Sequence, residues 1–101
     1  MLKTLEIINK QFKGVYVTIE DRVGNVAEGI FEKFEWEVPA DIYTGGDIKL
    51  RCFLAPKFPE DAELYGLNDE GFIEKVFDIN SVLITPLDEN GNKKTNHRLS
   101  H

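Results

Sequence analysis

Two cations and one aromatic residue alternate along a short segment in a pattern that suits nucleic acid binding. Lys49, Arg51 and Phe53 occupy every second position, so they share one face of a predicted strand. Cations on such a face neutralise phosphates, and an aromatic ring stacks on a base. A half-exposed strand also needs polar residues on its wet side, where Lys and Arg oppose pairing with other chains. Both interpretations stay open from the sequence.

Catalytic chemistry has few candidate groups. His97 and His101 lie in a polar C-terminal segment, where no fold would hold them near a nucleophile. The single cysteine, Cys52, shares the apolar face of its segment and is expected to be buried and inert. Glu35 and Glu37 share a strand face, which is typical of a solvated edge. No spacing suggests a metal site or a phosphate-binding loop, so neither an enzyme nor a cofactor is predicted.

The composition predicts one small domain with an acidic surface. The 101 residues include 42% hydrophobic and 30% charged side chains, which is the range of a globular domain with one core. The formal net charge is −6, and residues 58–89 hold nine acidic residues against Lys75 alone. This balance opposes general nucleic acid binding, although local patches act within about 8 Å. Without a membrane-spanning run, a signal peptide or a second cysteine, the sequence favours a reducing cytoplasm.

Periodicity predicts one helix followed by five short strands. An apolar stripe at helical spacing covers residues 2–12, and Gly14 is a common helix stop. Residues 60–67 are compatible with one or two helical turns or with an acidic loop. Alternation of apolar and polar residues predicts the strands at these positions: 15–20, 25–38, 48–54, 72–79 and 82–85.

Five bent strands in so short a chain suggest a small barrel. Such a barrel needs one long, bent strand that serves both halves, and residues 25–38 have the required length. Gly29 is the expected bend, and Ile30, Phe34 and Trp36 are expected on one face. We therefore predict a mainly β, five-stranded SH3-like barrel with an N-terminal α-helix. One domain would cover residues 1–88, and residues 89–101 would form a polar, flexible tail.

The order of elements and several residues resemble the Sm/LSm family of small barrels, which includes Hfq. The first motif of that family has a turn glycine, a second glycine five residues later, an apolar residue and then Phe-Asp. This chain keeps the spacing, with glutamate in place of aspartate, in the following residues: Gly24, Gly29, Phe31, Phe34 and Glu35. The resemblance extends from the predicted helix to the fifth predicted strand.

The chain departs from the family at two nucleotide-contacting positions. Val38 and Pro39 stand where the family has Met-Asn, whose asparagine helps to read a uridine base. Asp78 and Ile79 stand in place of Arg-Gly in the last turn, and residues 39–46 resemble an insertion. The acidic, diverged pattern is similar to that of Sm-like proteins encoded by marine phages.

The resemblance implies where a nucleic acid would bind. Trp36 and Tyr43 flank the loop that carries bases in Sm rings, although the spacing of Trp36 from Phe34 also favours a core position. Asn80 and Ser81 occupy the last turn, where family members contact RNA. Tight turns prefer the same residue types, so the structural interpretation stays open. Together with Lys49 and Arg51, these four residues form the predicted nucleic acid site.

The resemblance also implies self-association. Sm barrels pair the fourth strand of one subunit with the fifth strand of the next, and the matching segments here are rich in apolar and β-branched residues. Unpaired edges of this kind promote aggregation, and closing a ring removes them. We therefore expect a homo-oligomeric ring of five to eight subunits in the cytoplasm of a bacterial or phage-infected cell. It would bind single-stranded RNA or DNA without catalysis, in support of nucleic acid processing.

A second interpretation comes from a different class of protein. An acidic phage-type domain would bind a host protein, and its carboxylates would mimic nucleic acid or cover a basic surface. A third interpretation, a purely structural ring, depends on the edge strands alone. The partner-binding hypothesis places the contacting residues among the following: Glu60, Asp61, Glu63, Asp69 and Glu70.

Overall fold

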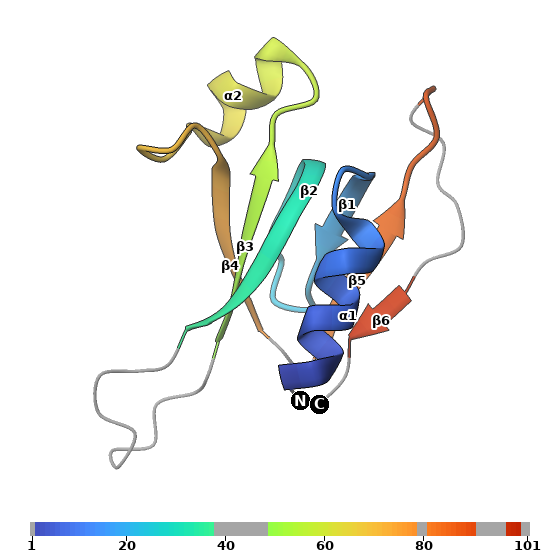
Figure 1. Ribbon diagram of the computed structural model, residues 1–101. Helices are drawn as coiled ribbons and strands as arrows, with labels where there is room; N and C mark the ends of the chain where they lie inside the picture. Colours follow the sequence, from blue (N-terminus) through green and yellow to red (C-terminus); the bar gives the residue numbers. More distant parts are fainter. Residues whose placement is uncertain (1, 38–48, 79–80, 91–96, 100–101) are drawn as a thin grey trace, which may run out of the picture.

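The computed structural model describes residues 2–37, 49–78, 81–90 and 97–99 (Figure 1). Within these ranges the chain forms two helices and six strands. Their bounds are α1 Leu2–Phe12, β1 Tyr16–Glu20, β2 Val26–Glu37, β3 Lys49–Ala55, α2 Pro59–Tyr65, β4 Ile73–Asp78, β5 Val82–Pro86 and β6 His97–Leu99. The mainly β class with an N-terminal helix is therefore confirmed.

The strands form one antiparallel sheet in the order β4-β3-β2-β1-β5-β6. β1 to β5 match the five predicted strands, whereas the sequence did not predict β6, which lies in the segment expected to be a tail. The sheet does not close, because no strand pairing joins β4 to β5 or β6 within the described ranges. The five-stranded barrel expected from the sequence is therefore shown only as an open, bent sheet.

The long strand β2 connects the two halves of the sheet. Residues 26–30 pair with β1, and residues 30–37 pair with β3, so β2 passes from one half to the other (Figure 1). Gly29 permits the close approach of β2 and β3, because a Cβ at this position would lie 2.6 Å from the carbonyl oxygen of Ala55. The role expected of this strand, a long element shared by both halves, is confirmed.

A β-bulge changes which side chains of β2 face the core. The register with β3 shifts between Phe31 and Lys33, two residues after the bend predicted at Gly29. Before the shift Phe31 is buried, and after it Phe34 is buried, which is a spacing of three rather than two. The prediction that Ile30 shares the core face with Phe34 is therefore wrong. An inserted residue reverses the alternation, and period-two reasoning cannot locate it.

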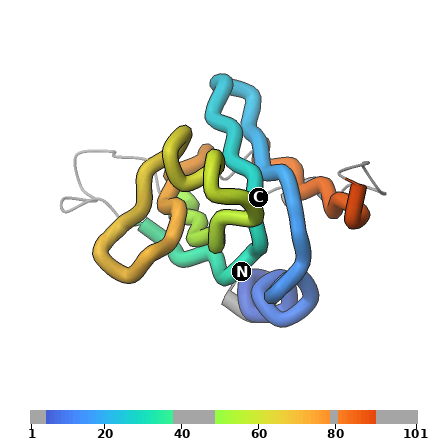
Figure 2. Tube along the Cα trace, turned by 90° about the horizontal axis from the view of Figure 1, so that it is seen from above, coloured from blue at the N-terminus to red at the C-terminus, as the bar shows by residue number. Residues whose placement is uncertain are grey.

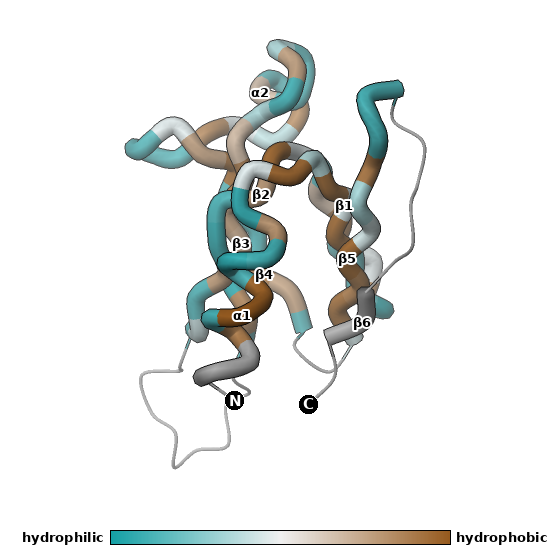
Figure 3. Tube along the Cα trace, turned by 45° about the vertical axis from the view of Figure 1, so that its right-hand side comes forward, coloured by the Kyte–Doolittle hydropathy of each residue, from teal (hydrophilic) through white to brown (hydrophobic). Residues whose placement is uncertain are grey.

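One core holds the fold together. It lies between the sheet and α1, which contributes Leu5 and Phe12 and lies to one side of the strands when seen from above (Figure 2). Hydrophobic residues follow the strands, whereas residues 88–90 after β5 are hydrophilic (Figure 3). The largest fully buried side chains are Phe31, Phe34, Phe77, Ile19, Leu50, Leu54, Ile73 and Ile84.

The acidic segment after β3 forms the helix α2. Pro59 occupies its first turn, where a missing N–H costs nothing, and the Asp61 carboxylate accepts a hydrogen bond from the Phe58 N–H at 3.2 Å. The chain leaves the helix at Gly66, whose φ is 73°. No residue of α2 is fully buried; Tyr65 packs against the core, and the rest of the helix adds mainly an exposed surface.

Candidate nucleic acid interface

Several predicted site residues lie at one end of the sheet, where β2 ends and β3 begins. Glu37 of β2 pairs in register with Lys49 of β3, and Lys49 pairs with Asp78 of β4. Trp36 lies one row further along β2. Ser81 immediately precedes β5 and lies at the same end, because the Arg22 N–H donates to its hydroxyl and the Asp78 N–H donates to the neighbouring Asp21. The structure thus places Trp36, Lys49 and Ser81 at this end, with Trp36 and Lys49 on opposite faces of the sheet.

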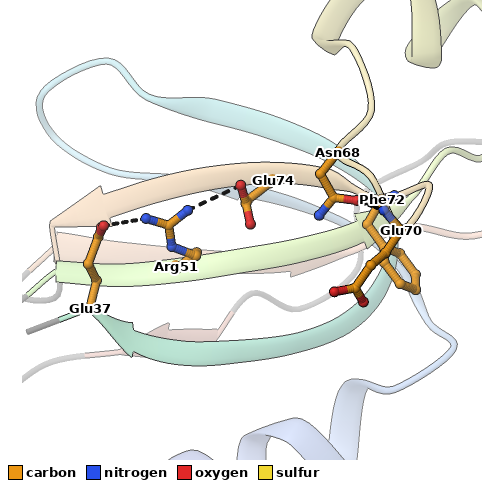
Figure 4. Close-up of polar contacts among 6 residues, drawn as sticks. All are labelled: Glu37, Arg51, Asn68, Glu70, Phe72 and Glu74. Carbon is orange, nitrogen blue, oxygen red and sulfur yellow. Dashed lines mark hydrogen bonds and ion pairs between the residues drawn. The ribbon is translucent and has the colours of Figure 1, made fainter.

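Arg51 is held between two carboxylates on the outer face of the sheet (Figure 4). One terminal nitrogen is hydrogen-bonded to Glu37, and the other lies 3.1 Å from an oxygen of Glu74. The hydrogen bond that Arg51 donates to Glu37 raises the pKa of Arg51 further, so the guanidinium stays charged. A phosphate that contacts Arg51 must therefore compete with both glutamates.

Lys49 differs from Arg51 in its surroundings. It is only half-buried, and it forms no ion pair with another residue in the described part of the chain. Its ammonium group remains available to an external anion. Of the two cations predicted to bind phosphate, Lys49 is the better placed.

The remaining predicted site residues are in different environments. Trp36 is half-buried and packs against the hydrophobic core, so both of its interpretations retain support. Ser81 is only 6% exposed, and its hydroxyl accepts a hydrogen bond from the Arg22 N–H at 3.3 Å. This contact gives Ser81 a structural role. Tyr43 and Asn80 lie outside the described residues.

Phe53 faces outward as its alternation with Arg51 predicted, but its ring is covered. It is only 8% exposed, and the ammonium group of Lys33 lies 5.0 Å from the ring centroid. Lys33 is in turn 2.7 Å from a carboxylate oxygen of Glu35. Phe53 is therefore packed under a cation and has little surface left for a base.

Sequence reasoning missed Asp21, whose carboxylate joins the β1–β2 turn to the end of β4. One oxygen accepts hydrogen bonds from the backbone N–H groups of Val23 and Asn25, at 3.1 and 3.0 Å. The other accepts the Asn25 side-chain amide at 2.9 Å and the Asp78 N–H at 3.1 Å. The β1–β2 turn is thereby fastened to the last residue of β4. An Asp at the start of a turn was the only sequence signal.

The hydrogen bonds also set the ionisation of this group. Burial alone would raise the pKa of Asp21, but the side chain of Asn25 and the backbone N–H groups outweigh burial and lower the pKa. The carboxylate therefore stays charged at neutral pH and holds the turn in place.

Asn9 of α1 is a second residue that the sequence did not reveal. Its side-chain oxygen accepts the Phe34 N–H at 2.8 Å, and its amide donates to the Phe34 carbonyl at 3.2 Å. β1 ends its pairing with β2 at Ile30, so this part of β2 pairs with no described strand on its α1 side. The Asn9 amide satisfies backbone groups that an adjacent strand would otherwise pair.

A second surface surrounds α2 and carries the acidic residues of the partner-binding hypothesis. Phe58, Leu64 and Leu67 are 43%, 74% and 47% exposed on and beside this helix. Glu60 and Glu63 lie among them and form no hydrogen bond or ion pair within the described ranges. Apolar and acidic side chains are thus interleaved on one exposed surface, which we call the α2 surface.

The cysteine considered for catalysis is enclosed by the hydrophobic core. Cys52 lies in the core, and burial raises the pKa of its thiol well above the ordinary value. The described residues contain no group of three or more His, Cys, Asp or Glu side chains placed to hold a metal ion. Nor does that part of the chain contain a helix long and apolar enough to cross a membrane.

Comparisons with protein-family models, with curated proteins and with solved structures find no match for this chain.

Proposed function

We propose that this chain is an Sm-like small barrel that assembles into a homo-oligomeric ring and binds single-stranded RNA without catalysing a reaction. The observation that carries the proposal is the outer edge of β4. This strand has six residues and pairs with β3 on one side, and no strand pairs with its other side within the described ranges, although the N–H of its last residue, Asp78, donates to Asp21. An edge of that length invites pairing with another chain, and ring closure satisfies it.

The residues behind the family resemblance support the small-barrel part of this proposal. Gly24 has a φ of 96° in the β1–β2 turn, a conformation that other residues rarely adopt. Gly29 permits the close approach of β2 and β3, and the rings of Phe31 and Phe34 pack edge to face at 5.0 Å. These positions bend the sheet, which is what a small barrel requires of them.

The end of the sheet around Lys49 supports the nucleic acid part. Lys49 forms no ion pair with another described residue, so its ammonium group is suited to a phosphate. Trp36 pairs with the buried Leu50 and lies on the core face of the sheet, opposite the outer face that carries Lys49. Arg51 lies two residues further along β3. It contacts the nucleic acid once a phosphate displaces one of its two glutamate partners. Lys49 is therefore assigned the main electrostatic contact.

Native mass spectrometry of the untagged protein at low micromolar concentration tests the assembly. A single closed species of five to eight subunits is the expected result. A monomer alone, at this concentration and in more concentrated samples, would contradict the ring, and most of the case for nucleic acid would be lost with it.

Fluorescence anisotropy with labelled oligouridylate, oligoadenylate and single-stranded DNA tests the ligand. We expect binding that weakens with salt, and Lys49→Glu should weaken it by about tenfold. Lys57→Glu is the matched control, because it makes the same charge change at a residue that lies just beyond the opposite end of β3. Failure of all three oligonucleotides to bind at low salt would overturn the RNA proposal. Equal losses of oligonucleotide affinity in the two variants would mean that the nucleic acid does not bind at the end of the sheet around Lys49.

The α2 surface favours a second candidate function, the binding of a basic protein partner. Its exposed Leu64 and Phe58 offer apolar contact, and the carboxylates of Glu60 and Glu63 form no hydrogen bond or ion pair with the described residues. Basic residues on a partner would complement this charge. The two functions predict different damaging changes: Glu60→Lys with Glu63→Lys would abolish partner binding and leave oligonucleotide affinity intact.

A further inference from the structure

The two edges of the sheet are not equivalent. β4 forms one edge, and no strand pairs with its outer side within the described ranges, where only the N–H of its last residue, Asp78, is bonded to Asp21. At the other end, the three-residue strand β6 pairs with residues 82–84 of β5. The opposite side of β5 is already occupied, since residues 83–86 pair with β1. The outer side of β5 is therefore the only one that an additional strand could use, and β6 occupies it.

A strand has one set of backbone N–H and C=O groups on each side, so two strands cannot pair with the same side at once. A strand of a second copy that joined β5 would need the groups that β6 uses. β6 covers three residues of β5, whereas β4 has five residues before Asp78, whose N–H is bonded to Asp21, and β5 has five residues, the last of them Pro86. The intermolecular pairing can therefore cover more residues of β5 than β6 does.

We propose that β6 is a detachable cap on the edge of β5, which competes with β4 of a second copy and so sets the concentration at which the chain assembles. This inference rests on the edge-to-edge assembly proposed above. β6 is attached to the same chain, so its effective concentration next to β5 is high and constant. The competing β4 belongs to another molecule, and its share rises with protein concentration. The cap thus keeps the chain monomeric when dilute and yields when the protein accumulates.

Proline substitution in β6 tests the cap in the full-length chain. His97→Pro, Arg98→Pro and Leu99→Pro together remove every backbone N–H of the strand. The triple alanine variant at the same positions is the matched control, because it changes the same side chains and keeps the N–H groups. Sedimentation velocity over a dilution series gives the midpoint concentration of assembly for each. Hydrogen exchange of the Val82 and Ile84 amides in dilute samples reports whether β6 covers β5.

We expect the proline variant to assemble at a midpoint about tenfold lower than the unaltered chain, with the alanine variant unchanged. Exchange at Val82 or Ile84 should also rise in the dilute proline variant. Equal midpoints in all three proteins would overturn the cap and leave the ring proposal standing. Faster exchange without assembly of any variant would overturn the ring proposal and the competition, while keeping β6 as a structural strand. Circular dichroism confirms that each variant is folded.

Discussion

The acidic side chains of the sheet and those of the α2 surface are used differently. In the sheet, Glu28 accepts the Tyr16 hydroxyl at 2.8 Å and the Thr18 hydroxyl at 3.1 Å. Asp21 accepts four hydrogen bonds, whereas Glu60 and Glu63 accept none from the described part of the chain. The net charge alone does not reveal this difference. Carboxylates that accept hydrogen bonds hold the fold together, and those that accept none from the described residues are available to partners.

Asp21→Ala should be the most damaging change, because it removes four hydrogen bonds to a charged acceptor at once. We expect a loss of about 2–3 kcal/mol in the free energy of unfolding. Urea denaturation followed by circular dichroism measures it. Asp21→Asn is the conservative control and should lose less, since it keeps one acceptor oxygen. A loss below about 0.5 kcal/mol for Asp21→Ala would mean that the β1–β2 turn is not fastened through this carboxylate.

The fold shows which features the sequence could predict and which it could not. Alternation located the five main strands, and the helical stripe located α1, because both depend on periodic burial. The bulge after Phe31 and the strand β6 were missed, since one is an aperiodic insertion and the other is a polar segment stabilised by backbone pairing. Local pattern does not specify either feature.

The candidate site was predicted less well than the fold, for a related reason. The sequence placed Arg51 and Phe53 on the outer face, and the structure agrees. It could not show that Glu37 and Glu74 flank Arg51, or that Lys33 covers Phe53. Those contacts are made across strands, between residues far apart in the chain. Residue type predicts which groups can bind a ligand, but cross-strand register decides which of them are already occupied.

Glu28→Ala should produce the next largest effect, because it leaves the Tyr16 and Thr18 hydroxyls without their shared acceptor. We expect a loss of about 1–2 kcal/mol in the free energy of unfolding. The variant also has a spectroscopic signature. Burial and the hydrogen bond to Glu28 raise the pKa of Tyr16 to about 12, and removal of Glu28 should lower it toward the ordinary value. Ultraviolet titration of tyrosinate measures the shift.

The matched control for this experiment is Tyr16→Phe, which removes the titrating group and keeps Glu28. Tyr16 ionises at a higher pH in the folded chain than in the unfolded chain, so its contribution to stability is complete below pH 10.0. That contribution is lost as the pH rises toward 12. Unchanged titration in Glu28→Ala would show that burial alone sets the pKa.

Acid should lower the free energy of unfolding by protonating Asp21. This loss should be smaller than that of Asp21→Ala, because the protonated side chain keeps acceptor atoms. The pKa of Asp21 is lowered in the folded chain, so the stabilisation is present above the ordinary value of 3.8. It is lost as the pH falls below 3.8 toward the folded pKa. Thermal unfolding of the unaltered chain and of Asp21→Asn at several pH values measures the difference, which should shrink in acid. A constant difference would mean that this carboxylate is not the titrating group.

Changes on the α2 surface should affect stability least. Glu60→Gln with Glu63→Gln removes two charges that have no partner among the described residues, so we expect a change within about 0.5 kcal/mol. Glu60 lies in the first turn of α2, where its charge favours the helix dipole, and this opposes the relief of acidic repulsion around it. Chemical denaturation of the double variant measures the balance. A loss as large as that of Glu28→Ala would show that these carboxylates also hold the fold together. The α2 surface would then have no carboxylates left for a basic partner, and the contrast with the sheet would disappear.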